Sequence, residues 1–278
     1  MSTRTHRLFL LRAYGDATIA LHFLVNSPEK NNYTIIASEH LKPLIKALGS
    51  YIDLSSLYIQ FVDFGITKSQ LNLFTNRHLI SSNTIRQVTK LKQFIKNNPN
   101  HGGIDYLEQN NKSGLLNLLL GHPFKAIVNK QVYAGMGEFF KSTSSIPPSN
   151  GTINKILIVP DARITDRRIP ENLIHYIKTK IGSDKLLQVA YFDKANKHFN
   201  KQSEFVSYSN FEELLELINE ADFVFGSDSL PIHLCNALQK PHYILYPKNG
   251  STAFFTPFSM ANKCYADFDK FSSTHFPI

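Results

Sequence analysis

The sequence predicts an α/β protein built from two domains with parallel sheets. Short runs rich in β-branched and aromatic residues alternate with segments whose apolar residues recur at helical spacing, as in successive β-α-β units. The chain has 278 residues, more than one core usually holds, so two domains are expected. A segment rich in Ser, Pro and Gly, KSTSSIPPSNGTIN at 141–154, interrupts the alternation. We therefore place one domain at residues 1–145 and the other at 146–278.

The strands and helices follow from residue patterns. Strands are expected at 7–12, 33–37, 57–62, 104–107, 155–159, 186–191, 222–226 and 242–246. Helices are expected after Gly15 and at 67–74, 84–96, 113–120, 170–181, 211–220 and 231–238. The same strand-then-helix order in both halves is typical of two Rossmann-like domains, and a ligand is expected in the cleft between them.

Composition and charge limit the class of partner. Thirty Lys and Arg against 22 Asp and Glu give a formal net charge of +8, which favours anionic partners such as phosphorylated substrates or an anionic membrane surface. The basic residues are scattered and no zinc-finger or RNP-type pattern occurs, so nucleic acid is not expected. The two cysteines form no disulfide framework, and the apolar run at 8–11 is too short for a signal peptide or a membrane span. We expect a cytoplasmic protein.

The most informative segment is ADFVFGSDSLPIHLCNALQKPHYILYP at 221–247. It is typical of a buried strand, a polar turn, a helix with Pro231 in its first turn, and another strand. The start of a helix offers unpaired N–H groups and a partial positive charge, so it can hold a diphosphate. Ser227, Asp228 and Ser229 surround that position, and His233 follows. Simple helix capping and a buried histidine remain the alternative interpretation.

This segment resembles the motif of the family 9 glycosyltransferases, the heptosyltransferases of lipopolysaccharide core synthesis. That motif runs Asp-Ser/Thr-Gly-x-x-His-Leu-x-x-Ala-Leu-Gly-Lys-Pro before an apolar strand. The residues that fit it are Asp228, Ser229, His233, Leu234, Ala237, Leu238, Lys240 and Pro241. Leu230 and Gln239 stand where the family has glycines. The resemblance implies a GT-B fold, with ADP-heptose or another nucleotide-diphosphate sugar as co-substrate.

Two further segments resemble the family on the acceptor side. HRLFLLRAYGDATIALHFL at 6–24 resembles its opening strand, Gly-Asp and helix, which implies that Gly15 lies on the acceptor side and that Asp16 is the catalytic base. A carboxylate is suited to take the proton of an acceptor hydroxyl, although a helix-start carboxylate also interacts favourably with the macrodipole without any catalysis. The segment 104–121 resembles the family's acceptor-side element and places Asn110 and Lys112 there.

The segment 155–177 resembles the first strand of the family's C-terminal domain and its Lys/Arg-x-Trp-Pro sequence. Arg167, Arg168, Ile169 and Pro170 fill these places. A fixed cation offsets the charge of a departing diphosphate, and arginine binds two phosphate oxygens at once. We expect Arg167, and second Arg168, to bind the donor. A solvated charge cluster before a helix is the alternative.

The expected function is metal-independent, inverting transfer of a sugar, heptose by resemblance, to a lipopolysaccharide-core or other glycan acceptor. The histidines show no close metal-ligand spacing, so neither a metal nor another cofactor is expected. A lipid-linked acceptor and the positive charge imply peripheral contact with the inner face of the cytoplasmic membrane. Two alternatives stay open. One is a non-catalytic nucleotide-sugar-binding GT-B protein, suggested by Leu230, Ile169 and the short chain, and the other is a nucleotide-sugar epimerase or hydrolase.

Overall fold

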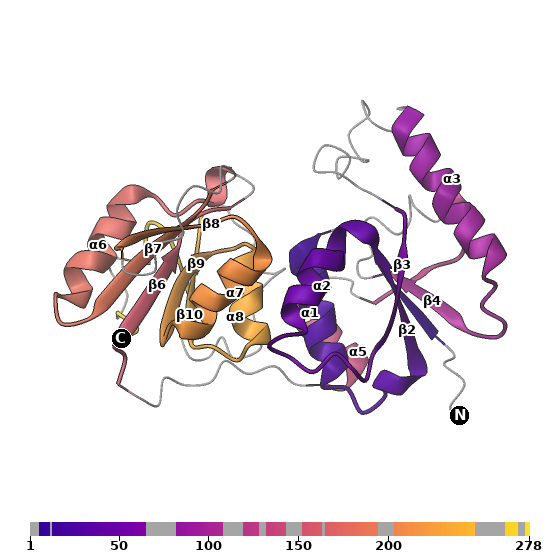
Figure 1. Cartoon of the computed structure of the whole chain (residues 1–278), viewed down its shortest axis with the longest axis horizontal. Coiled ribbons are helices and arrows are strands. Elements are labelled where there is room, and N and C mark those ends of the chain that lie inside the picture. The colour runs from indigo at the N-terminus through magenta and orange to yellow at the C-terminus, as the bar shows by residue number, and fades with distance from the viewer. Residues whose placement is uncertain are drawn as a thin grey trace. The chain divides into compact units, whose positions relative to one another are not determined.

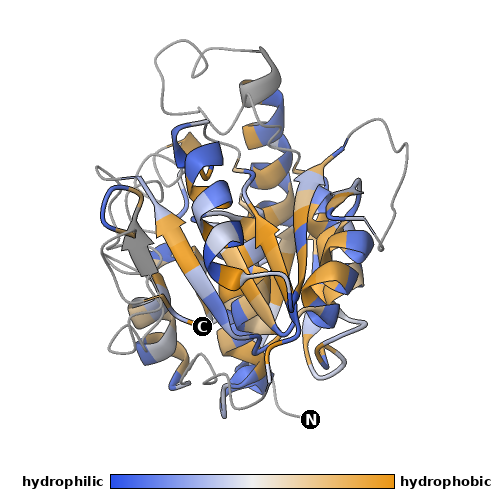
Figure 2. Cartoon of the chain, turned by 90° about the vertical axis from the view of Figure 1, so that its left-hand side faces the viewer, coloured by the Kyte–Doolittle hydropathy of each residue, from blue (hydrophilic) through white to orange (hydrophobic). Residues whose placement is uncertain are grey.

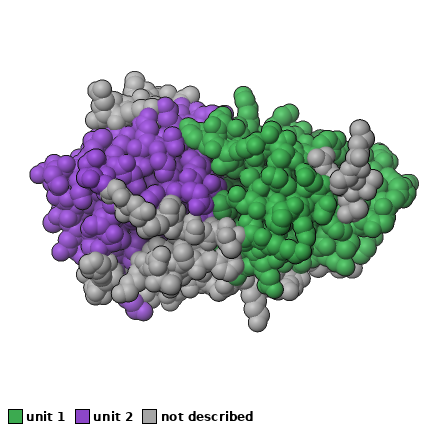
Figure 3. Space-filling view, turned by 90° about the horizontal axis from the view of Figure 1, so that it is seen from below, with its two compact units in different colours: residues 1–143 green, residues 144–278 purple. Residues whose placement is uncertain are grey.

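The structure is a computed structural model that describes residues 6–11, 13–64, 82–107, 119–127, 132–142, 152–162, 165–193, 203–247, 265–271 and 276–278. The chain divides into two compact units, Met1–Thr143 and Ser144–Ile278, which Figure 3 shows in different colours. In each unit parallel strands alternate with helices (Figure 1). The expected α/β fold of GT-B type, with Rossmann-like units, is confirmed.

The N-terminal unit is built on a five-stranded parallel sheet in the order β3-β2-β1-β4-β5. Its elements are β1 His6–Leu10, α1 Tyr14–Val25, β2 Tyr33–Ser38, α2 Lys42–Leu48, β3 Tyr58–Val62, α3 Ser82–Asn97, β4 Ile104–Leu107, β5 Lys125–Ala126 and α5 Val132–Phe140, with 3-10 turns η1 Lys30–Asn32 and η2 Glu39–Leu41. Every residue of β1 after His6 is buried, as expected for a central strand covered on both faces. The strand order reverses between β1 and β4, which is the Rossmann pattern.

The C-terminal unit is built on a six-stranded parallel sheet in the order β11-β10-β9-β6-β7-β8. Its elements are β6 Lys155–Val159, η4 Thr165–Arg167, α6 Glu171–Ile181, β7 Leu186–Phe192, β8 Phe205–Tyr208, α7 Phe211–Glu220, β9 Phe223–Ser227, α8 Leu230–Ala237, β10 His242–Tyr246 and β11 Tyr265–Asp267. Figure 2 shows its inner strands largely in the hydrophobic colour, while the helices alternate between hydrophobic and hydrophilic. The order reverses between β6 and β9, which pair in register from Ile156↔Phe223 to Val159↔Gly226.

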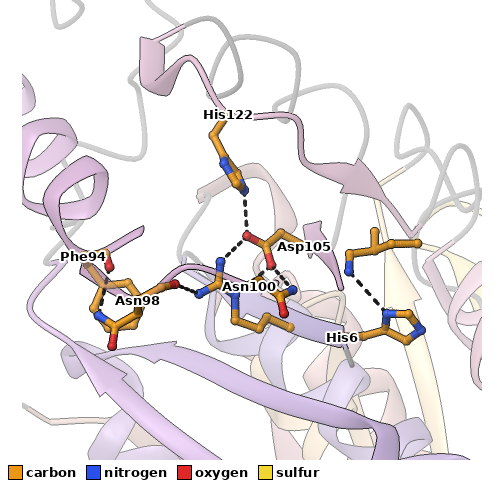
Figure 4. Close-up of polar contacts among 8 residues, drawn as sticks. His6, Phe94, Asn98, Asn100, Asp105 and His122 are labelled. Atoms are coloured by element: carbon orange, nitrogen blue, oxygen red, sulfur yellow. Dashed lines mark hydrogen bonds and ion pairs between the residues drawn. The ribbon is translucent and has the colours of Figure 1, made fainter. Parts of the chain in front are cut away.

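A buried ionic cluster joins the amino ends of β1 and β4 in the N-terminal unit (Figure 4). Arg7 donates from Nε to Asp105 Oδ1 at 2.7 Å, Asn100 Nδ2 donates to the same oxygen at 2.8 Å, and His122 Nε2 lies 2.6 Å from Oδ2. Burial alone raises the pKa of Asp105, but the hydrogen bonds from Arg7, Asn100 and His122 outweigh burial and hold that pKa below its ordinary value. The cluster lies at the amino ends of these strands, whereas α1 begins after the carboxyl end of β1, so the cluster joins segments of the fold.

All eight expected strands are present, with bounds that differ by two residues at most. Expected helices at 84–96, 170–181, 211–220 and 231–238 correspond to α3, α6, α7 and α8, and the helix after Gly15 to α1. The expected helix at 67–74 lies outside the described residues, as does most of the one at 113–120. The sequence patterns did not predict the short helices α2 and α5 or the edge strands β5, β8 and β11.

Candidate functional site

The candidate site of the C-terminal unit lies at the carboxyl ends of β6 and β9. These neighbouring strands flank the point where the strand order reverses. The connections that leave them, through α6 to β7 and through α8 to β10, run in opposite directions along the sheet, and right-handed crossovers then leave an opening between them. Open parallel sheets bind their ligands at such a point.

A turn of two serines closes the end of β9. Ser227 and Ser229 each donate from Oγ to the main-chain carbonyl of Asp161, at 3.2 and 3.1 Å, and their hydroxyl oxygens lie 3.0 Å apart. Ser227 is fully buried, so its side chain holds the turn together and does not face solvent. Ser229 is the N-cap residue of α8 but makes no side-chain capping bond. The first amide groups of α8 therefore have no side-chain cap from this residue.

The structure brings together two of the expected donor-binding residues. Arg167, at the end of η4, lies with Nη1 2.6 Å from Asp228 Oδ2. The Asp228 side chain is 4% exposed and that of Arg167 is 42% exposed. A buried carboxylate needs such a partner, because an unpaired charge is costly to bury. A guanidinium carries five N–H donors, so Arg167 can pair with Asp228 and still donate to an anion in solvent.

The neighbouring arginine has a different partner. Arg168 donates from Nε to the carbonyl of Ala162 at 3.4 Å, and Nε lies 3.9 Å from Asp161 Oδ1. Its side chain is more exposed than that of Arg167. Ile169, which stands where the family has tryptophan, is buried in the core of the C-terminal unit. Arg167 is therefore the arginine that meets the start of α8, while Arg168 is held on the β6 side.

His233 lies in α8, just beyond its first turn, and is buried. The pKa of His233 is lowered to about 3, chiefly by burial and in addition by the nearby His242 and Arg167. The imidazole is neutral near pH 7, so it offers hydrogen-bonding groups and no positive charge. The interpretation of His233 as a buried core histidine agrees with this environment.

Helix α8 packs closely on β9 near its start and ends in a defined C-terminal cap. A Cβ added to Gly226 would lie 2.6 Å from Ile232 Cδ1, so any larger residue here would force the Ile232 side chain or α8 to move. At the other end, Lys240 N donates to Cys235 O at 2.8 Å and Gln239 N to Asn236 O at 3.1 Å, which is a Schellman motif. Gln239 has a φ of 56°, a conformation that glycine adopts without strain.

The residues expected on the acceptor side belong to the N-terminal unit. Gly15 and Asp16 lie in the first turn of α1, which begins directly after the carboxyl end of β1. The N-cap Ala13 provides no side-chain capping bond, and Asp16 is the acidic residue of this first turn. Its carboxylate therefore also meets the positive end of the helix macrodipole. Asn110 and Lys112 lie outside the described residues.

Two kinds of feature are absent from the described part of the chain. Among the residues whose placement is described, no group of three or more His, Cys, Asp or Glu side chains could hold a metal ion. Within the same ranges, no helix has the length and apolar character needed to span a bilayer.

Comparison with known proteins connects this geometry to a family. The family model "Glycosyltransferase family 9 (heptosyltransferase)" matches residues 182–270, about a third of the chain, including β9, the serine turn and α8. No curated protein matches the sequence.

Several solved structures have the same fold at low sequence identity. E. coli heptosyltransferase WaaC with ADP-2-deoxy-2-fluoro heptose is 12% identical with a TM-score of 0.53, over 90% of this chain and 92% of that one. The family 9 glycosyltransferase from Veillonella parvula DSM 2008 is 11% identical with a TM-score of 0.57, over 96% and 87% of the two chains. E. coli ADP-heptose lps heptosyltransferase II is 13% identical with a TM-score of 0.53, over 95% and 89%. The expected resemblance to family 9 is confirmed, and with it the expectation of a glycosyltransferase that uses a nucleotide sugar.

Proposed function

We propose that this protein is a metal-independent, inverting glycosyltransferase that transfers heptose from ADP-heptose to a lipopolysaccharide-core or other glycan acceptor. The observation that carries the proposal is the ion pair of Arg167 and Asp228 at the start of α8, within the segment that the family model matches. The donor follows from a structural neighbour of the same fold, WaaC, which was solved with an ADP-heptose analogue.

The donor diphosphate binds at the amino end of α8 in this proposal. The macrodipole of α8 favours an anion there, and Arg167 adds a full positive charge beside it. Within the first turn Pro231 has no N–H, and the N–H of Ile232 donates to Ser229 O at 3.2 Å. Asp228 orients the guanidinium, Ser229 and His233 provide neutral hydrogen-bonding groups, and Ser227 holds the turn. Arg168 contributes charge from the β6 side.

The transfer step needs one base and one stabilised leaving group. A hydroxyl oxygen of the acceptor attacks the anomeric carbon, the bond from that carbon to the diphosphate oxygen breaks, and configuration inverts. Asp16 takes the hydroxyl proton, while Arg167 and the start of α8 offset the charge that develops on ADP. Because this cation and helix supply the charge that a metal ion supplies elsewhere, the proposal includes no metal. Gly15, Asn110 and Lys112 are proposed on the acceptor side.

The proposed cellular site is the cytoplasm, with peripheral contact at the inner face of the cytoplasmic membrane. A formal net charge of +8 favours an anionic membrane surface and an anionic glycolipid acceptor. Nucleic acid is not among the proposed partners.

The test is a transfer assay with ADP-heptose and heptose-deficient lipopolysaccharide, with ADP release and the mass of the glycolipid as readouts. Wild type is expected to form product of inverted anomeric configuration, at a rate that a chelator does not change. Asp16→Asn is expected to lose turnover while it still binds donor, whereas Arg167→Ala is expected to lose donor affinity. Arg86→Ala, which removes the same charge from the other unit, is the control and is expected to retain both.

The alternatives give different results in the same assay. Donor binding without any product would favour a non-catalytic binding protein, for which Leu230 in place of the family glycine is the specific observation. Release of free sugar without acceptor would favour a hydrolase. Equal turnover by Asp16→Asn and wild type would remove Asp16 from the mechanism.

A further inference from the structure

Two consecutive main-chain carbonyls at the end of β6 hold the two halves of the candidate donor site. The carbonyl of Pro160 accepts from the N–H of Ile169 at 3.0 Å, which fixes the segment that follows Arg167. The carbonyl of Asp161 accepts from the hydroxyls of Ser227 and Ser229 at 3.2 and 3.1 Å. The dipeptide 160–161 is therefore the common support of the arginine segment and of the serine turn.

The side chain of Asp161 determines where this support lies. Its Oδ2 accepts from the main-chain N–H of Phe192 at 3.0 Å, at the carboxyl end of β7. Its Oδ1 lies 3.9 Å from Arg168 Nε, and the side chain is 26% exposed. Asp161 thus connects the carboxyl ends of three neighbouring strands. It follows β6 in the chain, its carboxylate binds the end of β7, and its main-chain carbonyl binds the end of β9.

We propose that Asp161 is a positioning residue of the donor site, holding the serine turn and the start of α8 in register with Arg167. This inference rests on the proposed function. Asp161 acts through its hydrogen bonds. The bond from the Phe192 N–H fixes the position of the carboxylate, and with it the direction of the Asp161 carbonyl. That carbonyl holds the hydroxyls of the two serines, which position the first turn of α8. Its negative charge makes no favourable contribution to a diphosphate, since like charges repel.

The variants Asp161→Ala and Asp161→Asn distinguish the hydrogen bonds of Asp161 from its negative charge. An asparagine keeps an oxygen that can accept from the Phe192 N–H, and alanine does not. The matched control is Asp222→Ala in the same unit. Asp222 Oδ2 accepts from the main-chain N–H groups of Asn154 and Lys155 at 2.9 and 2.8 Å. These bonds lie at the amino ends of β6 and β9, opposite the candidate site.

The first readout is the Kd for ADP-heptose by calorimetry. Asp161→Ala is expected to bind about tenfold more weakly, the equivalent of about 1.4 kcal/mol. Asp161→Asn is expected to bind as wild type does, and Asp222→Ala is expected to lose stability without losing affinity. Equal weakening in Asp161→Ala and Asp161→Asn would show a direct role for the charge and would overturn the positioning role. Unchanged affinity in Asp161→Ala, or the same loss in Asp222→Ala, would also overturn it.

The second readout is hydrogen exchange of the amides of residues 227–230 and 232 in the absence of donor. Asp161→Ala is expected to accelerate exchange there, with Asp161→Asn and Asp222→Ala close to wild type. If wild type fails to bind ADP-heptose, the proposed function fails, and this exchange pattern still decides whether Asp161 positions the turn. Uniform acceleration across the unit in Asp161→Ala would show general destabilisation and contradict the inference.

Discussion

Removing the Arg167 guanidinium is expected to destabilise the C-terminal unit as well as to weaken donor binding. The change Arg167→Ala leaves the carboxylate of Asp228, which is 4% exposed, without its cation at 2.6 Å. Breaking a buried ion pair in this way costs about 3–5 kcal/mol. Water can reach Arg167, whose side chain is 42% exposed, so solvent already screens part of the attraction. We therefore expect a loss of about 2–3 kcal/mol in the free energy of unfolding.

A double-mutant cycle separates the pair from its surroundings. Asp228→Asn removes the buried charge and keeps the shape, so Arg167→Ala is expected to cost about 1–2 kcal/mol less in the Asp228→Asn background than in wild type. The measurement is urea unfolding of the four proteins at pH 7, followed by far-ultraviolet circular dichroism. If the two units unfold in separate transitions, only the one that belongs to residues 144–278 is expected to move.

The ion pair of Lys178 and Glu204 in the same unit, whose carboxylate is 52% exposed, provides the control. Lys178→Ala is expected to cost less than about 1 kcal/mol, because exposed ion pairs contribute little. If Arg167→Ala is as stable as wild type, or if the two substitutions have strictly additive effects, then Arg167 does not stabilise the buried carboxylate of Asp228, and this prediction is refuted.

Three further predictions concern the packing of the fold. Burial lowers the pKa of both His22 and His242 to about 4. Below the unfolded value near 6.5 the unfolded chain therefore binds protons that the folded chain does not, and stability is expected to fall from pH 6.5 toward pH 4, by about 1.4 kcal/mol for each histidine at pH 5.5. His242→Gln is expected to reduce this loss in urea titrations at pH 7.5 and 5.5. Gly226→Ala is expected to cost about 1–3 kcal/mol, since its Cβ would meet Ile232 at 2.6 Å, and an unchanged urea midpoint would contradict this contact. Gln239→Gly is expected to raise stability by about 0.5–1 kcal/mol, because φ is 56° there, and a lower thermal midpoint would show that the side chain compensates for the strain.

The strands and the order of the elements could be predicted from the sequence, because buried central strands consist of uninterrupted apolar runs. Residues 156–159 of β6 are all buried, and so is every residue of β9. The edge strand β8 was missed because its FVSY sequence alternates exposed, buried and half-buried positions in only four residues. Helix α2 was missed because seven residues give too few turns for a helical pattern.

The candidate site could be predicted only in part. The residues around the start of α8 followed from the motif, but the ion pair of Arg167 with Asp228 depends on β6 and β9 being neighbours, which no local pattern shows. Ser227 was predicted to bind the donor, and its hydroxyl donates to the main-chain carbonyl of Asp161 inside the fold. Asp161 itself was missed because its contact with the serines uses a main-chain carbonyl, which leaves no mark in the residue type. Its place directly after a central strand was the one available signal.

The most direct test of the proposed donor site is a calorimetric titration of ADP-heptose into wild type, Arg167→Ala and the control Arg86→Ala at pH 7.5. We predict saturable binding to wild type and to Arg86→Ala, and binding at least about tenfold weaker to Arg167→Ala, as expected for the loss of a charge-assisted contact to the diphosphate. No binding to wild type, or equal affinity in wild type and Arg167→Ala, would contradict the assignment of the donor site to the start of α8.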